Sequence, residues 1–314
     1  MTQFSAKGSI LRVGSRGSPL ALAQAREVKS RLAAAGFDAE RIEIKVIRTS
    51  GDAIQDRPLA EAGGKGLFTK EIEEALLSGA IDVAVHSAKD VPTVLPAGLA
   101  LSAVLPREDA RDAFISRKAK ALRDLPVGAV VGTASLRRQA FVKRSRPDLA
   151  VVTLRGNVET RLRKLDAGEV DATLLAVAGL KRLGLVAVAT AILDPDEFLP
   201  AIGQGAIAIE TRTDDPATLA LVAKIDDADT ASALAAERAF LAVLDGSCRT
   251  PIGGHASVSG GMLRFRGMIA TPDGGEAFEV LRQGRREDAA ALGADAGREL
   301  QKRAGVDFFA SLRI

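Results

Sequence analysis

Residues 10–47, ILRVGSRGSPLALAQAREVKSRLAAAGFDAERIEIKVI, set the fold class of the chain. The apolar run from Ile10 to Val13 predicts a strand, and Ser18 followed by Pro19 is typical of a helix N-cap and first helical residue. The helix is expected to end at Gly36, with one apolar face made of Leu20, Ala21, Ala25, Val28 and Leu32. Alternating apolar residues at 42–47 predict the next strand. A strand, a helix and a strand in this order favour a parallel sheet of the α/β class.

The same alternation of strands and helices continues beyond this stretch. Residues 69–77 are expected to form a helix, and residues 81–85 a buried strand. A second α/β unit follows, with strands expected at 129–131, 151–154 and 172–177 and helices at 136–144 and 158–165. Proline and glycine then break the periodicity, and the β-rich run at 206–210 is predicted to return to the first sheet.

The C-terminal third has a different pattern. An apolar helical stripe begins near Thr230, and apolar residues within 289–300 mark a last helix. Between them, strands expected at 263–269 and 277–281 flank the turn TPDGG, which is a hairpin signal. We therefore expect two α/β domains and a small C-terminal α+β domain. The predicted boundaries are residues 1–105 with 204–224 for domain 1, 106–203 for domain 2 and 225–314 for domain 3.

The composition is that of a globular protein. The 314 residues are 47% apolar and 26% charged, and the length suggests two or three domains. No apolar run approaches the roughly 20 residues that span a bilayer, and the N-terminal stretch lacks the unbroken apolar core of a secretory signal. We therefore expect a cytoplasmic protein that does not bind a membrane. One cysteine and two histidines exclude an internal disulfide and are too few for a typical zinc site, so no metal is expected.

Positive charge is concentrated between Ser135 and Leu165, although the net charge of the chain is only +3. Against two acids, Asp148 and Glu159, this segment holds nine bases: Arg137, Arg138, Lys143, Arg144, Arg146, Arg155, Arg161, Arg163 and Lys164. Arginine forks suit planar carboxylates or phosphates. The single aromatic residue of the segment, Phe141, gives no platform on which bases would stack, so nucleic acid is not an expected partner. A solvated basic helix face explains the charge alone equally well.

The segment VHSAKDVP at 85–92 has both a functional and a structural interpretation. It follows an apolar strand, and open α/β sheets bind ligands at the carboxyl ends of their strands. Lys89 and Asp90 are therefore candidates for positioning a cationic intermediate. The alternative is that Asp90 forms an Asx-type turn before Pro92, which spacing alone favours.

Two further features also have two interpretations each. Cys248 lies in a glycine-flanked loop beside Arg249, which favours the thiolate, so it is either a reactive thiol or a small buried apolar residue. Lys65 lies in the loop GGKG at 63–66, which either covers a ligand or acts as a plain hinge. Sequence position alone favours the small buried apolar residue for Cys248 and favours neither interpretation for the Lys65 loop.

Six segments, taken in order, match one family. They are VGSRGSPLAL at 13–22, GGKGLF at 63–68, VHSAKDVP at 85–92, GTASLRR at 132–138, LRGNVETRL at 154–162 and GSCRTPIG at 246–253. On these motifs the chain resembles the porphobilinogen deaminase family, also called hydroxymethylbilane synthase, over essentially its whole length. The resemblance implies a transferase of tetrapyrrole and haem biosynthesis that joins four porphobilinogen molecules, releases ammonia, and hydrolyses the product off as hydroxymethylbilane. It also implies two domains resembling periplasmic binding proteins around a cleft, with a third that carries the cysteine.

The matching motifs imply roles for individual residues. Cys248 matches the cysteine that holds a dipyrromethane cofactor through a thioether, and Asp90 matches the catalytic aspartate. Each porphobilinogen unit carries two carboxylates, so a growing oligopyrrole needs many fixed cations. The implied cofactor-binding residues are Lys89, Ser18, Ser135, Arg137, Arg138, Arg155 and Asn157. The implied substrate-binding residues are Arg16, Lys65, Arg155, Arg161 and Arg182.

Two other classes of function compete with this one. A non-catalytic two-lobed protein that binds a small polyanion would explain the arginines, but it gives Cys248 no role and usually needs an export signal. A nucleic-acid binder is disfavoured because the basic segment lacks aromatic residues. The expected partners are therefore porphobilinogen and the growing oligopyrrole, and the chain is expected to act as a monomer.

Overall fold

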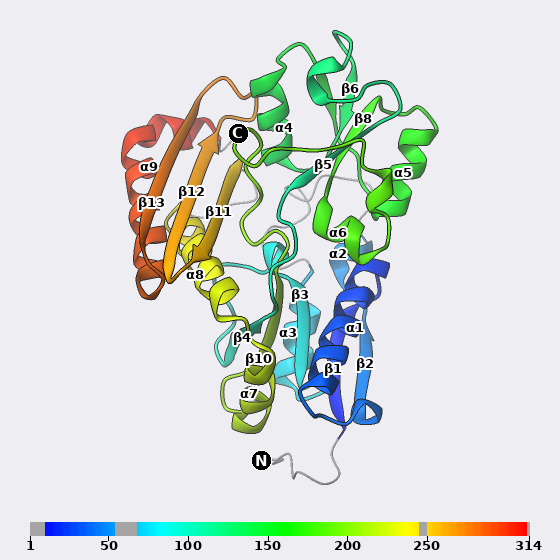
Figure 1. The fold of residues 1–314 in the computed structure, drawn as a ribbon, viewed down its shortest axis with the longest axis vertical. Coiled ribbons are helices and arrows are strands. Elements are labelled where there is room, and N and C mark those ends of the chain that lie inside the picture. Colours follow the sequence, from blue (N-terminus) through cyan, green and yellow to red (C-terminus); the bar gives the residue numbers. More distant parts are fainter. Residues whose placement is uncertain (1–9, 54–67, 245–249, 313–314) are drawn as a thin grey trace. The chain divides into compact units, whose positions relative to one another are not determined.

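The chain forms two compact units in a computed structural model that describes residues 10–53, 68–244 and 250–312 (Figure 1). The described part of unit 1 consists of residues 10–53, 68–108 and 206–231. The described part of unit 2 consists of residues 109–205, 232–244 and 250–312. The division into three domains with the boundaries given above stays a prediction.

The sheet of unit 1 has the strand order β2-β1-β3-β10-β4. Strand β1 (Leu11–Arg16) lies between β2 (Ile42–Ile47) and the central strand β3 (Val83–Ser87) and pairs in parallel with both. Strand β10 (Ile207–Arg212) lies between β3 and β4 (Leu99–Val104) and is antiparallel to both. The predicted return of the chain to the first sheet is therefore confirmed. The strand expected at 81–85 begins and ends two residues later than predicted.

Helices pack on both faces of this sheet because successive strand residues point to opposite faces. Val83 and Val85 pack in one cluster with Val28 of α1 (Pro19–Ala34). Ala84 packs on the opposite face with Ile72 and Leu76 of α3 (Lys70–Leu77). The other helices of unit 1 are α2 (Ser50–Ala53), α7 (Pro216–Val222) and the short 3₁₀ helices η1 (Ala39–Arg41), η2 (Ala88–Asp90) and η5 (Ala223–Ile225).

Unit 2 contains a second five-stranded sheet with the order β7-β6-β8-β5-β9. These strands are β5 (Asp112–Ser116), β6 (Val130–Gly132), β7 (Ala150–Val152), β8 (Ala172–Ala176) and β9 (Ala191–Ile192). Strand β6 is parallel to β7 and β8, and β5 is antiparallel to β8. The associated helices are α4 (Leu136–Ser145), α5 (Val158–Asp166), α6 (Val177–Arg182), η3 (Leu122–Asp124) and η4 (Val186–Val188).

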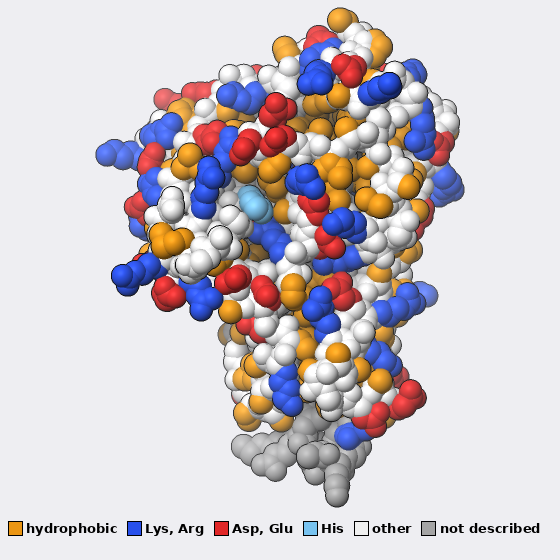
Figure 2. Space-filling view, viewed as in Figure 1, with side chains coloured by type: hydrophobic (Ala, Val, Ile, Leu, Met, Phe, Trp, Pro, Cys, Tyr) orange, Lys and Arg blue, Asp and Glu red, His pale blue; other side chains and the backbone are white. Residues whose placement is uncertain are grey.

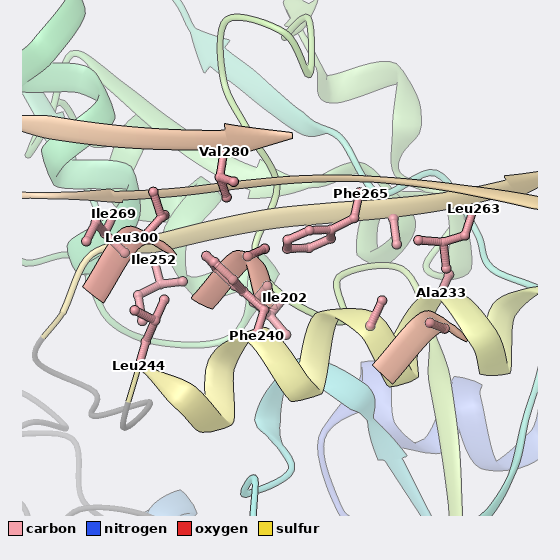
Figure 3. Close-up of a cluster of buried hydrophobic side chains, with 14 of the residues drawn as sticks. Ile202, Ala233, Phe240, Leu244, Ile252, Leu263, Phe265, Ile269, Val280 and Leu300 are labelled. Atoms are coloured by element: carbon pink, nitrogen blue, oxygen red, sulfur yellow. The ribbon is translucent and has the colours of Figure 1, made fainter. Parts of the chain in front are cut away.

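The C-terminal part of unit 2 is a three-stranded antiparallel sheet packed against two helices. Its elements are β11 (Ile252–Ser259), β12 (Met262–Ala270), β13 (Ala277–Arg285), η6 (Arg286–Asp288), α9 (Ala289–Ser311) and α8 (Ala228–Val243), of which residues 228–231 belong to unit 1. Figure 3 shows Phe240 of α8 directed toward Phe265 of β12, and their ring centroids are 5.0 Å apart. The predicted hairpin is confirmed, because Ala270 pairs with Ala277 across the turn. None of the described helices is long and apolar enough to cross a membrane.

Candidate active site

The carboxyl ends of β1 and β3 bring four of the candidate residues of unit 1 to one edge of its sheet. Arg16 ends β1, and Ser18 caps α1 by accepting a hydrogen bond from the Ala21 N–H at 3.3 Å. Strand β3 leads directly into η2, which carries Lys89 and Asp90. Because β1 and β3 are parallel, both ends lie at the same edge, where open α/β sheets bind ligands.

Asp90 is exposed at this edge, and its carboxylate forms no hydrogen bond or ion pair with the part of the chain that the structure describes. An Asx-type turn would require this carboxylate to accept a backbone N–H. The turn is closed instead by the backbone, since the Val91 N–H donates to the Ala88 carbonyl at 3.3 Å. The Asx-turn interpretation is therefore not supported, and the carboxylate is accessible to a ligand.

The surroundings of Arg16 hold this edge in place. The Arg16 guanidinium lies over the Phe68 ring, 4.0 Å from its centroid, which is a favourable cation–π contact. Gln24 of α1 donates a hydrogen bond to Ser87 Oγ at 2.8 Å and so links that helix to the end of β3. Phe68 belongs to a segment that the sequence analysis quoted, but its role beneath the guanidinium was not foreseen.

A buried cluster of one histidine and two glutamates lies on the face of the sheet where α3 packs. His86 Nε2 and Glu210 Oε2 are 2.9 Å apart, and both side chains are almost fully buried. Glu73 of α3 is 8% exposed. Burial, together with the nearby charge of Glu210, raises the pKa of Glu73 above its ordinary value. This cluster lies in the core and includes none of the residues expected to bind ligand.

The parallel strands of unit 2 likewise bring candidate residues to one edge of that sheet. Strands β6 and β7 lead into α4 and α5, whose first turns point N–H groups at this edge. Ser135 caps α4 by accepting from the Arg138 N–H at 3.4 Å, and Asn157 caps α5 by accepting from the Thr160 N–H at 2.8 Å. Arg155 lies in the connection from β7 to α5, Arg161 lies in α5, and Arg182 ends α6, the helix that follows the parallel strand β8. Cations and helix N-termini at one edge suit an anionic ligand.

Gly156 has a geometric reason to be glycine between Arg155 and Asn157. Its φ is +119°, a conformation that L side chains rarely adopt. A Cβ there would lie 2.7 Å from Thr160 Cβ, in the first turn of α5. The Arg161 guanidinium also donates to the Gly156 carbonyl at 2.9 Å. The glycine therefore lets the chain turn sharply into the helix while arginines flank the turn.

Arg137 and Arg138 lie inside unit 2 rather than on its surface, with 5% and 6% of each residue exposed. Both donate to the fully buried Asp112 carboxylate, each from Nη2 at 2.7 Å. Arg137 also donates to the Leu199 carbonyl at 2.7 Å, and Arg138 to the Leu174 carbonyl at 2.8 Å. The alternative that these two arginines form a solvated basic face is therefore wrong.

The charge of this cluster is not balanced. Two guanidinium groups face one carboxylate, which leaves one buried positive charge in surplus. Burial alone would raise the pKa of Asp112, but the two arginines hold it well below its usual range. Burial also lowers the pKa of Arg137, whose Nε has no hydrogen-bond partner in the described part of the chain. A surplus cation with an unused donor fits a ligand carboxylate, as on a dipyrromethane group.

Some of the candidate residues lie outside the described ranges. These are Cys248, the expected attachment point, and Lys65 with its glycine loop. Conversely, the structure reveals two residues at the arginine pair that the sequence analysis missed, Asp112 and Gln204. Asp112 is a single acid at the start of an apolar strand, and such a residue requires a partner when buried. The need of a buried carboxylate for a charged partner was therefore the sequence signal that could have identified Asp112.

Known proteins match this chain along nearly its whole length. Residues 11–220 match the family model described as "Porphobilinogen deaminase, dipyromethane cofactor binding domain". Residues 231–302 match that described as "Porphobilinogen deaminase, C-terminal domain". A porphobilinogen deaminase of Nitrobacter hamburgensis is 67% identical over 309 residues, 98% of each chain. One of Nitrobacter winogradskyi is 68% identical over 298 residues, 95% of this chain and 94% of that one.

Solved structures show a more distant likeness. A putative methionine-binding lipoprotein of Bacillus subtilis is 16% identical, with a TM-score of 0.43, over 70% of this chain and 91% of that one. That score is too low to support a conclusion about function. The sequence identity of about two-thirds with the two Nitrobacter proteins covers nearly complete chains, and by contrast it decides the family. The resemblance seen in the sequence motifs is thus confirmed, and the chain belongs to the porphobilinogen deaminase family.

Proposed function

We propose that this chain is a hydroxymethylbilane synthase. It joins four porphobilinogen molecules head to tail, releases one ammonia for each molecule joined, and hydrolyses the linear tetrapyrrole from the enzyme. The observation that carries this proposal is the match of both family models, in order, over residues 11–220 and 231–302. The family match does not favour the alternative of a non-catalytic polyanion binder.

The arginines at the two sheet edges are proposed to bind the carboxylates of substrate and growing chain. Arg16 belongs to unit 1, and Arg155, Arg161 and Arg182 to unit 2; Lys65 is the remaining candidate. Guanidinium forks bind carboxylates in two parallel hydrogen bonds, which fixes orientation as well as charge. Anchoring each pyrrole ring by its acetate and propionate groups holds the reacting pyrrole carbons close together. This lowers the entropic part of the activation free energy of condensation.

Asp90 is proposed as the catalytic residue. Loss of ammonia from porphobilinogen leaves a cation, and an ionised carboxylate already in place stabilises it without reorganising. The Asp90 carboxylate is exposed and accepts no hydrogen bond from the described residues, so it is available to pyrrole N–H groups. The same oxygen atoms can take up the proton that is lost when the new carbon–carbon bond forms.

The cofactor proposed for this chain is dipyrromethane, which supplies the pyrrole carbon to which the first substrate unit is joined. Cys248 is proposed to carry it through a thioether, because a thiolate is a far better nucleophile toward a carbon electrophile than a hydroxyl. The groups proposed to hold its carboxylates and N–H groups are Ser18, Lys89, Ser135, Arg137, Arg138, Arg155 and Asn157. The surplus charge at the arginine pair supports this assignment.

The experiment that tests the proposal measures the intact mass of the denatured protein. Wild-type protein is expected to be heavier than its sequence by a two-pyrrole unit and to release ammonia from porphobilinogen. The Cys248→Ser variant is expected to lack the added mass. An unmodified wild-type mass in an active preparation would contradict the role of the cofactor, and an adduct retained by Cys248→Ser would place it on another residue.

The proposed partners are porphobilinogen and the growing oligopyrrole, without nucleic acid or membrane. On the face drawn in Figure 2, acidic and basic side chains of the described residues are interspersed, which gives nucleic acid no extended basic patch on that face. The cytoplasmic location and the monomeric state stay predictions. Sedimentation of the purified chain with and without porphobilinogen would test the second.

A further inference from the structure

The Asp112 carboxylate at the start of β5 is the common acceptor for a set of buried donors. Arg137 Nη2 and Arg138 Nη2 each donate to it at 2.7 Å, and Arg138 Nε donates at 3.2 Å. Gln204 Nε2 adds a hydrogen bond at 3.0 Å. Asp112 is 0% exposed, so all of these bonds form away from bulk water, where they are strong and their loss is costly.

The carboxylate is itself held firmly. Gln204 also donates to the Ala110 carbonyl at 2.7 Å, two residues before Asp112, so one amide group fixes both the strand start and the carboxylate. Strand β5 continues into the centre of the unit through Phe114 and Ile115, which are fully buried. Asp112 is therefore a rigid reference point to which the two long arginine side chains are attached.

Aromatic rings restrict Arg137 further. Its guanidinium carbon lies 5.8 Å from the Phe141 ring centroid and 5.6 Å from that of Phe198, and the two rings pack edge to face. Carboxylate and rings together leave the guanidinium group little freedom. Arg137 Nε remains without a partner in the described part of the chain, so this ordered group keeps one donor unused.

The charge count of this cluster differs from that of a simple ion pair. One carboxylate and one arginine balance in charge, whereas here a second buried arginine adds a positive charge that costs free energy unless an anion neutralises it. Neutralising that charge requires an acceptor from outside the cluster. The cluster therefore combines an internal anion that orients the arginines with a surplus charge that remains for a ligand.

We propose that Asp112 is a positioning residue, which fixes the guanidinium groups of Arg137 and Arg138 in the orientation that receives ligand carboxylates. The proposal rests on the proposed function, in which these arginines bind the carboxylates of a pyrrole chain. Asp112 acts only through the arginines and need not touch the ligand. Its removal is therefore expected to weaken ligand retention rather than to abolish the chemistry at Asp90.

The experiment compares Asp112→Asn with a matched control in the other unit. Asp82 is also buried and also accepts hydrogen bonds from an arginine, with Arg12 Nη2 at 2.7 Å and Arg12 Nε at 2.9 Å. Arg212 Nη2 lies 3.4 Å from it. Asp82→Asn therefore removes a comparable buried charge without touching any residue expected to bind ligand.

Two quantities are measured for both variants: the fraction of protein that carries the two-pyrrole mass, and the KM for porphobilinogen. Both variants are expected to have a lowered thermal midpoint. Asp112→Asn is expected to lower the adduct fraction at least fivefold or raise KM at least tenfold, whereas Asp82→Asn changes both quantities less than twofold. Equal behaviour of the two variants in adduct fraction and KM would overturn the positioning role.

A second variant keeps the test decisive if Asp112→Asn does not fold. Gln204→Met removes one donor to the carboxylate and leaves every charge in place, and it is expected to raise KM about threefold with a proportionate loss of adduct. A folded Gln204→Met protein with wild-type KM and adduct fraction would then overturn the proposal. A wild-type protein without adduct or turnover would instead defeat the proposed function, and the positioning role with it.

Discussion

At the scale of single residues, Arg138 is expected to contribute to both stability and ligand binding. Replacing it with leucine removes two hydrogen bonds to Asp112 and leaves the Leu174 carbonyl without this donor. A hydrogen bond to a charged group is worth about 1.5 to 3 kcal/mol, but Asp112 keeps Arg137 as its partner, and removing the surplus charge offsets part of the loss. We therefore expect Arg138→Leu to lower the free energy of unfolding by only about 1.5 kcal/mol and to reduce turnover of porphobilinogen, as measured by urea unfolding and steady-state kinetics.

Arg117 provides the matched control for this substitution. It belongs to the same unit and forms an ion pair with Asp166, but both side chains are about half exposed. Exposed pairs contribute little, so Arg117→Leu is expected to change stability by less than about 1 kcal/mol and turnover not at all. Equal effects of the two leucine variants on turnover would show that the buried position of Arg138 has no special function.

Asp90 is expected to separate activity from stability. Its carboxylate is exposed and without a partner in the described part of the chain, so Asp90→Asn should leave the urea midpoint unchanged. The amide has nearly the same size but cannot neutralise a cation, and loss of one such contact commonly costs about a hundredfold in rate. Single-turnover kinetics with porphobilinogen should show this loss. Near-normal turnover in the folded variant would remove Asp90 from the mechanism.

At the scale of secondary-structure elements, Glu73 makes the packing of α3 on its sheet sensitive to pH. Burial raises its pKa in the folded state, so its contribution to stability is present below the unfolded pKa of about 4.3 and is lost as pH rises through the folded value. Glu73→Gln removes the ionisation. The variant is therefore expected to be more stable than wild type at pH 7, with the difference shrinking toward pH 4.

Urea unfolding of both proteins at several pH values would measure this difference. Glu74 is the neighbouring residue of the same helix and is exposed, so Glu74→Gln controls for the change in net charge and helix propensity. A stabilisation by Glu73→Gln that does not vary with pH, or that is matched by Glu74→Gln, would show that ionisation of the buried carboxylate is not its cause.

Elements with strong local signals were predicted correctly from the sequence. Ser18 and Pro19 predicted the start of α1, and Ser18 does accept the expected capping hydrogen bond. Strand β11 was missed, because IGGHASVS lacks an apolar alternation. Its place is set by close packing instead: a Cβ on Gly254 would lie 2.4 Å from Ile202 Cδ1, a contact between residues far apart in sequence.

The roles of the candidate site residues stay predictions. Arg16, Asp90 and Arg155 lie in motifs with recognisable local patterns, and these three residues end or follow β1, β3 and β7. The partner of the arginine pair was not predictable from those motifs. Asp112 lies 25 residues before Arg137, and only the pairing of β5 with β8 and β8 with β6 brings them together.

At the scale of the whole molecule, the described residues change from one unit to the other three times, after Glu108, Gly205 and Ala231, and hydrogen bonds connect the separate segments within each unit. In unit 1, the Leu105 N–H donates to the Ile207 carbonyl at 3.1 Å, and the Arg107 N–H donates to Thr230 Oγ1 at 3.0 Å. In unit 2, the Gly203 N–H donates to Glu237 of α8 at 2.6 Å. Each unit is thus assembled from segments that are distant in sequence.

The place of β10 between β3 and β4 sets an order for folding during synthesis on the ribosome. Strand β4 pairs only with β10 among the described strands, so the N-terminal unit lacks a complete sheet until residues 207–212 have emerged, long after its first strands. The five-stranded sheet of unit 2 is complete at residue 192, so this later segment can fold before the sheet of unit 1. Arrested nascent chains exposing residues 1–205 should therefore show a protease-sensitive N-terminal unit, and chains exposing residues 1–231 a protected one. Equal protection in both would mean that the first strands fold without waiting for β10.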